Sequence, residues 1–258
     1  MAAKSKSFFT AEEIHSKRLR SEELLPGLAY HLLPALKERF TNKTLERTCQ
    51  QCQKPSKNNR VYCYECLVPV TAEASLALPP KLSLPLKLDV VRHPKELKTK
   101  STALHAQVLC EPGQVRTQEL PQAMDLLAKE IDPSKTLLLF PSADAKELGE
   151  IENLAQYERL VVIDSTWSQA NIMLKSEFIS EVCKDCPRVK LGSNHETSFW
   201  RHQDKGDDHL ATIEAIYYFY KEYKEAVEGK KDSEGEYDNL LFIFVGLLRL
   251  IEDSKTVA

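Results

Sequence analysis

Four cysteines occur as two closely spaced pairs that could hold a metal ion. Cys49 and Cys52 form one CxxC motif, and Cys63 and Cys66 form a second one ten residues later. Each motif presents two thiolates from one tight turn, and four thiolates are a common ligand set for tetrahedral Zn²⁺. Redox-active or simply buried cysteines are the alternative interpretation. We expect a closed structural zinc site, which would stabilise the fold without itself catalysing a reaction.

A third CxxC motif, Cys183 and Cys186, has no partner pair in the sequence. Exposed surface thiols are as plausible there as metal ligands. The N-terminal twenty residues mix charged and polar types and do not resemble an export signal. We therefore expect a reducing compartment, the nucleus and/or the cytoplasm, where cysteines are thiols or metal ligands rather than disulfides.

A second candidate site is the tetrapeptide Asp164-Ser165-Thr166-Trp167, which follows the apolar run 160–163 and precedes a predicted helix. In α/β proteins, ligands bind outside the carboxyl ends of the strands, where backbone N–H groups and short polar side chains converge. Asp164 could cap the following helix, bond to loop amides, or act as a base on a substrate. The motif predicts a site at this strand end and leaves those three roles open.

A further cation follows the predicted strand 196–200. Arg201 and His202 would then lie at the same edge of the sheet as Asp164. An arginine there could bind a carboxylate through two parallel hydrogen bonds, and a surface ion pair with a nearby aspartate is the alternative. The next helix, which we expect from about residue 209, would point its N-terminus at the same edge, with Glu214 satisfying its dipole.

Two segments of the chain are locally basic although the net charge is −3. Residues 43–66 and 81–106 each carry more Lys and Arg than Asp and Glu, with Tyr62, Tyr64 and His93 interleaved. Cations beside aromatic rings are typical of RNA-binding surfaces, which contact phosphate and stack on bases. A solvated face balanced by acidic segments elsewhere is an equally good interpretation.

Short apolar runs alternate with helix-like segments and predict an α/β fold with a mainly parallel sheet. Strands are expected near 86–91, 136–140, 160–163, 188–191 and 196–200. Helices are expected in residues 10–40, 103–109, 124–131, 143–156, 168–179, 209–227 and 237–251. The first of these should be interrupted at Pro26-Gly27 and at Pro34, and Ser101-Thr102 should cap the second. We expect a helical N-terminal arm in residues 1–45, a Cys₄ module in 46–70, and a catalytic domain in 71–258.

Several common protein classes lack their signature in this chain. No GxGxxG or Walker A sequence occurs, and eight glycines in 258 residues make a glycine-rich nucleotide loop unexpected. No GxSxG motif is present. The longest apolar stretch, 240–248, is far too short to span a bilayer, so we expect no membrane contact.

Several motifs, in order, make the chain similar to the DTW-domain family. They are DSTW at 164–167, the YCYECLVPV segment after the first CxxC, LPLKLDVVRHP at 84–94, STALHA at 101–106, LFPS at 139–142, and FWRHQ followed by LATIEAIYYF. The resemblance covers roughly residues 46–250. Within the family, the chain most resembles the eukaryotic tRNA-uridine aminocarboxypropyltransferases.

The resemblance implies a SPOUT-like knotted α/β fold with S-adenosylmethionine as the donor. It implies transfer of the 3-amino-3-carboxypropyl group to N3 of a tRNA uridine, in the D-loop for eukaryotic relatives, with release of 5′-methylthioadenosine. The catalytic residues would be Asp164, Thr166 and Trp167. The donor would lie against three strand-end loops that include Leu139, Phe140, Pro141, Ser142, Asp164, Ser165, Arg201, Leu210 and Thr212.

Two other functions stay open at this point. A SPOUT-type RNA methyltransferase would use the same fold and donor and would leave S-adenosylhomocysteine. A non-catalytic, zinc-containing RNA-binding protein would bind RNA without consuming S-adenosylmethionine. The partner in all three cases is RNA, tRNA in the first, and the sequence does not fix the oligomeric state.

Overall fold

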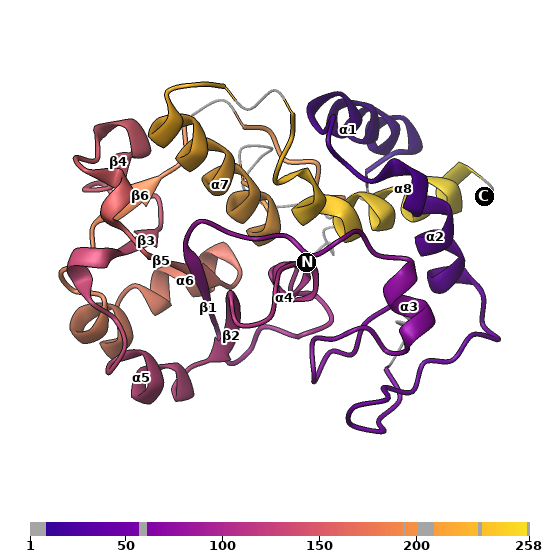
Figure 1. Ribbon diagram of the computed structural model, residues 1–258, viewed down its shortest axis with the longest axis horizontal. Coiled ribbons are helices and arrows are strands. Elements are labelled where there is room, and N and C mark those ends of the chain that lie inside the picture. The colour runs from indigo at the N-terminus through magenta and orange to yellow at the C-terminus, as the bar shows by residue number, and fades with distance from the viewer. Residues whose placement is uncertain (1–8, 57–60, 193–194, 201–208, 232–233, 257–258) are drawn as a thin grey trace, which may run out of the picture.

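The computed structural model describes residues 9–56, 61–192, 195–200, 209–231 and 234–256, with the side chains of Trp167, Ser168 and Thr256 left out. A six-stranded parallel sheet forms its centre, in the order β2-β1-β5-β3-β6-β4 (Figure 1). The strands are β1 (Lys87–Arg92), β2 (Val115–Glu119), β3 (Thr136–Leu139), β4 (Lys146–Glu147), β5 (Arg159–Asp164) and β6 (Arg188–Lys190). The predicted α/β class with a mainly parallel sheet is confirmed.

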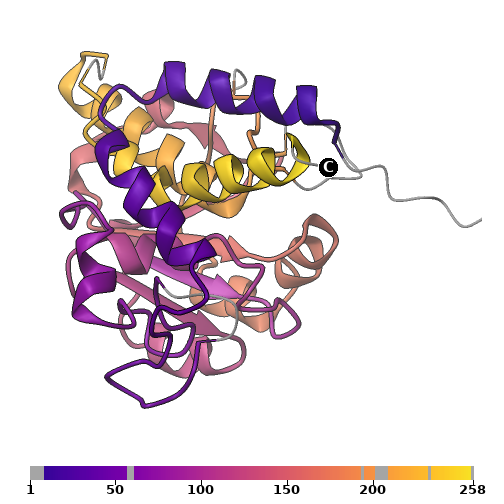
Figure 2. The same cartoon turned by 90° about the vertical axis from the view of Figure 1, so that its right-hand side faces the viewer.

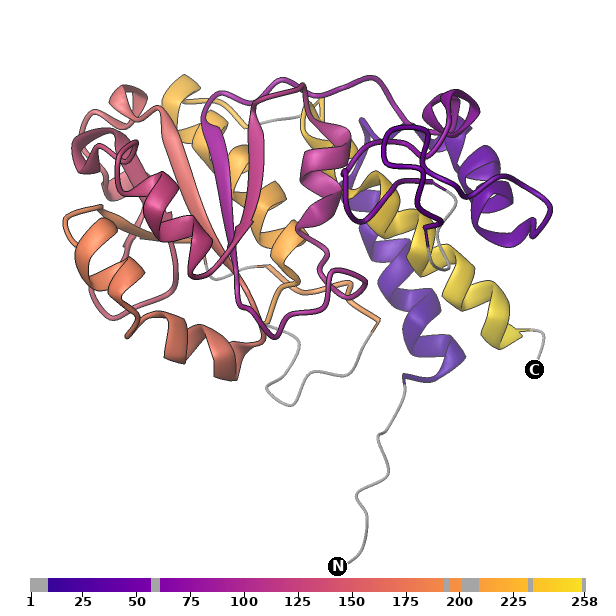
Figure 3. The same ribbon diagram turned by 90° about the horizontal axis from the view of Figure 1, so that it is seen from below.

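Each face of the sheet is covered by helices, because alternate side chains of the central strands are apolar on both sides. Val90 and Val162 point to the face that packs against α4 (Leu104–Leu109) and α7 (Thr212–Glu228). Val161 and Ile163 point to the other face, against α5 (Gln122–Leu127), α6 (Trp167–Met173) and the turn Phe178–Val182. Asp164 follows Val162 by two positions, so it shares the face that α7 covers. Figure 3 shows α7 running along one face of the sheet.

The chain's first and last helices lie side by side at one end of the sheet (Figure 2). They are α1 (Ala11–Leu24) and α8 (Phe242–Thr256), with α2 (Leu33–Thr41) also against α8. Gly246 of α8 permits the close approach of α2, since a Cβ built on this glycine would lie 2.3 Å from Leu36 Cδ2. None of the helices in the described part of the chain is long and apolar enough to cross a membrane.

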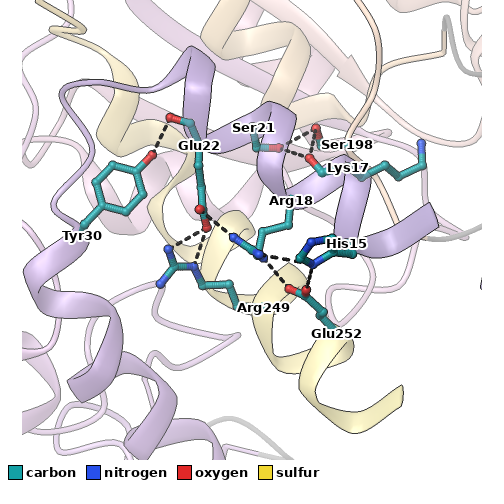
Figure 4. A network of polar contacts seen from close by, with 9 residues as sticks. All are labelled: His15, Lys17, Arg18, Ser21, Glu22, Tyr30, Ser198, Arg249 and Glu252. Atoms are coloured by element: carbon teal, nitrogen blue, oxygen red, sulfur yellow. Dashed lines mark hydrogen bonds and ion pairs between the residues drawn. The ribbon is translucent and has the colours of Figure 1, made fainter. Parts of the chain in front are cut away.

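A polar network joins α1 to α8 (Figure 4). Glu22 accepts from Arg18 at 2.7 Å and from Arg249 at 2.8 Å, and Arg18 also reaches Glu252 at 2.5 Å. Glu252 lies 2.5 Å from His15 as well. The residues of the N-terminal helix are therefore held against the C-terminal helix by charge pairs in addition to apolar packing.

Local structure differs from the prediction at several places. Residues 143–156, expected as a helix, form β4 and the short 3₁₀ turns Leu148–Glu150 and Leu154–Gln156, where Asn153 is left-handed with φ 51°. The described part of 196–200 is not a strand, and β2 was not predicted. Pro34 lies in the first turn of α2, where it needs no N–H partner, and does not interrupt it.

Candidate functional site

The four cysteines of the two paired motifs form one cluster. The sulfur atoms of Cys49, Cys52, Cys63 and Cys66 all lie within 4.8 Å of one another, and Cys52 and Cys63 sulfurs are 3.8 Å apart. Sulfurs at the corners of a tetrahedron with Zn–S bonds of ~2.3 Å would be separated by about 3.8 Å. The cluster therefore has the size that a tetrahedral metal ion requires.

The two turns of the cluster have the same backbone design, displaced by fourteen residues. Gln53 N–H donates to Cys49 O at 2.8 Å, and Leu67 N–H donates to Cys63 O at 2.9 Å. Gln53 and Leu67 are both left-handed, with φ of 60° and 55°. Burial raises the pKa of the Cys66 thiol to about 12, so the cluster needs a cation before all four sulfurs can ionise. This donor set fits a metal ion.

Cys183 and Cys186 belong to a different environment. Both are buried in the apolar layer that includes Phe178 and Ile179, which rules out exposed surface thiols, one of the two interpretations left open by the sequence. Within the described residues, the four-cysteine cluster is the one set of His, Cys, Asp or Glu side chains close enough together to share a metal ion. We assign the buried pair to packing.

Asp164 ends β5 and accepts hydrogen bonds from two distant segments. Ser101 Oγ donates to its Oδ2 at 2.6 Å, and Thr212 Oγ1 donates to its Oδ1 at 2.8 Å. The Nε of Arg92 lies 3.6 Å from Oδ2. The three partners come from the loop before α4, the first residue of α7 and the end of β1, so this carboxylate joins three elements at one sheet edge.

The environment of Asp164 acts on its pKa in opposite directions. Asp164 is 3% exposed, and this burial raises the carboxyl pKa, while the two hydroxyl donors and the Arg92 charge oppose the rise. The net direction is upward. A carboxyl group with a raised pKa is a better proton acceptor, and perturbed buried carboxyls often mark functional sites.

Arg92 is a component of this site that the sequence analysis did not identify. It ends β1 beside Asp164, and Glu119 ends β2 on its other side, so the ends of three adjacent strands form a charged row. Its side chain is 4% exposed and lies 3.6 Å from Glu119 Oε2 through Nη1. The available signal was the position of Arg92 directly after a buried apolar strand, the same position that drew attention to Asp164.

Ser101 and Thr102 do not cap α4 as predicted, because both hydroxyls are used elsewhere. Ser101 donates to Asp164, and Thr102 Oγ1 accepts from Ile213 N–H at 3.3 Å. Asp164 does not cap α6 either, since Thr166 is its N-cap and accepts from Gln169 N–H at 3.4 Å. The loop 93–102 is thus tied to α7 and β5 rather than to its own helix.

Glu214 supports the start of α7, as expected for a carboxylate in the first turn. It accepts from Ala211 N–H at 2.8 Å, Ser198 N–H at 2.7 Å and Thr197 Oγ1 at 2.6 Å. Lys17 of α1 donates to Thr197 O at 3.0 Å. The N-terminal helix therefore contributes to holding the segment that fixes α7 and, through Thr212, the Asp164 site.

The loops expected to hold the donor meet at this edge. Leu139 pairs with Val162 on the neighbouring strand, so the segment of Leu139, Phe140, Pro141 and Ser142 leaves the sheet beside Asp164 and Ser165. Leu210 and Thr212 approach from the other side through the bond of Thr212 to Asp164. The buried Ser165 hydroxyl has no hydrogen-bond partner within the described structure, which fits a site that offers it to a polar ligand.

Three expected site residues lie wholly or partly outside the part of the chain that the structure describes. Arg201 and His202 fall in 201–208, and the side chain of Trp167 is among those left out. Of the basic residues, Lys43, Arg47, Lys54, Lys95 and Lys100 are exposed, around the cysteine cluster and after β1. Other exposed lysines, such as Lys129, Lys146 and Lys184, lie elsewhere in the described chain.

The amino-acid sequence of this chain matches one protein family and several of its members. The DTW domain model matches residues 60–252. The chain is 34% identical to "tRNA-uridine aminocarboxypropyltransferase 1" of Xenopus laevis, over 81% of this chain and 82% of the relative. It is 29% identical to the Homo sapiens protein of the same name, over 97% and 91%. A Drosophila melanogaster "tRNA-uridine aminocarboxypropyltransferase 2" is 34% identical over 46% of this chain and 50% of the relative.

No solved structure matches the chain. The family match extends from the second CxxC motif to α8 and therefore includes the whole sheet, the Asp164 cluster and the loops around it. The resemblance inferred from the sequence motifs is confirmed: the chain belongs to the DTW-domain family.

Proposed function

We propose that this chain is a tRNA-uridine aminocarboxypropyltransferase that uses S-adenosylmethionine to modify N3 of a uridine. The observation that supports this most strongly is the buried Asp164 carboxylate, which accepts two hydrogen bonds at the sheet edge of a DTW domain. Relatives of this domain are named tRNA-uridine aminocarboxypropyltransferases. The donor would supply an electrophilic γ-carbon, so that the N3–H and S–Cγ bonds break, the N3–Cγ bond forms, and 5′-methylthioadenosine leaves with the sulfur electron pair.

The Asp164 cluster would remove the N3 proton. Ser101 donates its own proton to Asp164 Oδ2, which leaves its oxygen lone pairs available to accept an N–H from the substrate. Transfer of the N3 proton to Ser101, and of the Ser101 proton to Asp164, would place the proton on a carboxyl group whose pKa burial already raises. Positioned proton transfer of this kind is typically worth ~10²–10⁴-fold in rate.

The donor would lie against residues 139–142, Ser165 and the start of α7. The Ser165 hydroxyl offers a hydrogen bond that no described protein group takes. The N–H groups at the start of α7 are partly used, because Ile213 N–H donates to Thr102. Arg201 is therefore our first candidate for the donor carboxylate, with Thr212 second. Trp167 and Thr166 remain candidates for contact with the reacting groups.

The proposed enzyme also has an expected fold, metal, substrate position and location. The sheet would belong to a SPOUT-like knotted fold, and the four-cysteine cluster would hold a structural Zn²⁺. The substrate would be a D-loop uridine of tRNA, and the location the nucleus and/or the cytoplasm. The exposed cations beside the cysteine cluster support contact with RNA phosphates.

Nucleoside mass spectrometry after incubation with S-adenosylmethionine and unmodified tRNA tests the proposed reaction. We expect a uridine that gains the aminocarboxypropyl mass, together with one equivalent of 5′-methylthioadenosine. A methylated nucleoside with S-adenosylhomocysteine would instead indicate a methyltransferase. Tight tRNA binding without donor consumption would indicate a non-catalytic RNA-binding protein.

A further inference from the structure

A cavity of about 210 Å³ lies between the cysteine cluster, the loop before α4 and the helix α8. Aromatic rings supply much of its wall: Tyr62 and Tyr64 from the second CxxC turn, Phe199 and Trp200 from the segment before α7, and His105 from α4. Tyr62 packs edge to face against Tyr64, with centroids 5.1 Å apart at 71°, and against His105, whereas Phe199 and Trp200 are tilted at 54°. Such walls suit a flat π system.

The cavity is apolar at its sides and polar at two defined places. Of the polar lining residues, Thr99 and Lys100 are exposed and so mark its mouth, whereas Ser101 and His105 are 5% and 3% exposed and so mark its inner end. The Nδ1 atom of His105 is buried without a hydrogen-bond partner among the described groups. Burial lowers the His105 pKa to about 3, so the ring is neutral and suits an uncharged polar ligand.

The size of the cavity limits what it can hold. Pockets for drug-sized ligands are roughly 300–1,000 Å³. A volume of about 210 Å³ is too small for a whole nucleotide-containing donor and adequate for a single ring. The choice of ring follows from the neighbouring carboxylate, because Ser101 both lines this cavity and donates to Asp164 at 2.6 Å.

We propose that this cavity receives the uracil ring of the substrate nucleotide, turned out of its RNA stack, with its N3 edge toward Ser101. The inference rests on the proposed function and adds to it the place of the nucleobase. The ring would lie against Tyr64 and Trp200, with one polar edge toward His105. Lys100 at the mouth would meet the adjoining phosphate. The second CxxC turn thereby forms one wall of the substrate site.

Photocrosslinking tests this placement without requiring catalysis. A tRNA transcript containing 5-iodouridine is bound to the full chain and irradiated, and the crosslinked peptides are identified by mass spectrometry. We expect crosslinks to Tyr62, Tyr64 or Trp200. Crosslinks confined to other regions, or none from a bound complex, would overturn the inference even if the enzyme forms product. Crosslinks in the cavity without any transferred group would leave the base pocket standing and refute the proposed reaction.

A variant series separates the nucleobase from the donor. We expect Tyr64→Leu to lower kcat/KM for tRNA by roughly 5- to 150-fold, the usual effect of losing one base–aromatic stack. Tyr64→Phe should retain most of the activity, because the ring remains. S-adenosylmethionine binding, measured by equilibrium dialysis, should be unchanged in Tyr64→Leu. Loss of donor binding with tRNA binding intact would show that the cavity holds the adenine of the donor and would overturn the inference.

Tyr30→Leu is the matched control. Tyr30 is also half-buried, but it packs in the helical layer and donates to Glu22 O at 3.0 Å. We expect its kcat/KM for tRNA to stay within about twofold of the parent chain. An equal loss in Tyr30→Leu and Tyr64→Leu would indicate a general packing effect and would contradict a specific base pocket.

Discussion

The cysteine cluster and the Asp164 cluster are both sets of polar groups held inside the protein, but they are assembled in different ways. All four cysteines lie between residues 49 and 66, on two turns of the same design. Arg92, Ser101, Asp164 and Thr212 come from four separate segments that only the parallel sheet and α7 bring together. A local site can be recognised from spacing, whereas a nonlocal one requires the topology.

The two clusters also differ in what compensates for burial. The cysteine cluster needs an ion from outside, because four neighbouring thiols do not all ionise by themselves: the pKa of Cys66 is raised to about 12. Burial of the Asp164 carboxylate is partly compensated by the protein's own hydroxyls and by Arg92. We therefore expect metal removal to affect the first region most, and side-chain changes to affect the second.

Metal removal is expected to have the largest effect. Chelation or Cys63→Ser should disorder residues 46–70, because metal binding in such sites contributes on the order of 10 kcal/mol to folding. Metal content by mass spectrometry and limited proteolysis would measure this. The sheet should persist, as followed by circular dichroism. A metal-free protein with an unchanged protease pattern would contradict a structural metal site.

Replacement of Asp164 should mainly affect catalysis. Asp164→Asn keeps the side-chain shape and should lower single-turnover aminocarboxypropyl transfer by ~10²–10⁴-fold. Asp164→Ala should in addition destabilise the fold by ~3–5 kcal/mol, because Arg92 loses its buried partner. Denaturant titration separates the two effects. Near-normal turnover of Asp164→Asn with intact donor binding would exclude Asp164 as the proton acceptor.

His105 lines the cavity between the cysteine cluster and the Asp164 cluster, and its lowered pKa should make the stability of the chain depend on pH. Its pKa is lowered from 6.5 to about 3 in the folded chain, so the unfolded state binds more protons between these values. The free energy of unfolding therefore rises with pH across this window, by up to ~1.4 kcal/mol per pH unit from this residue. The stability that neutral His105 contributes is lost progressively as the pH falls from 6.5 toward 3.

Comparison of the parent chain with His105→Gln isolates this contribution. The variant should show a flatter dependence of the free energy of unfolding on pH between about 3 and 6.5. Burial raises the pKa values of Asp164 and Glu214, so above their ordinary pKa values these two carboxyls make the free energy of unfolding fall with pH. Both carboxyls are present in the parent chain and in the variant, so their effect cancels in the comparison. Parallel curves would mean that His105 takes up a proton in the folded state as readily as in the unfolded one.

Loss of a helix cap should have the smallest effect. Thr166→Ala removes the N-cap of α6 and should lower the free energy of unfolding by ~1 kcal/mol, whereas Thr166→Ser should retain most of it. Thr10→Ala, which removes the matching cap of α1, is the comparison. A much larger loss at Thr166 than at Thr10 would indicate that this cap also fixes the strand end at Asp164.

Periodicity predicted the parts of the fold where burial decides the local pattern. The apolar runs of β1, β3 and β5 were recognised because strands covered on both faces are continuously apolar. The half-buried β2 was missed, because its residues VRTQE carry little of that pattern. In residues 143–156, helix-forming residues misled the prediction, since turns around the left-handed Asn153 replace the helix there.

The sequence by itself determined the cysteine cluster, the parallel sheet and the strand end at Asp164, because each depends on spacing or periodicity within about twenty residues. Only the tertiary structure decided which groups meet that carboxylate. It assigned Ser101 to Asp164 and Thr102 to α7 instead of to a cap, and it placed Arg92 at the site. The physical reason is that a buried carboxylate must be hydrogen-bonded, while the segments that supply its donors are chosen by how strands and helices pack.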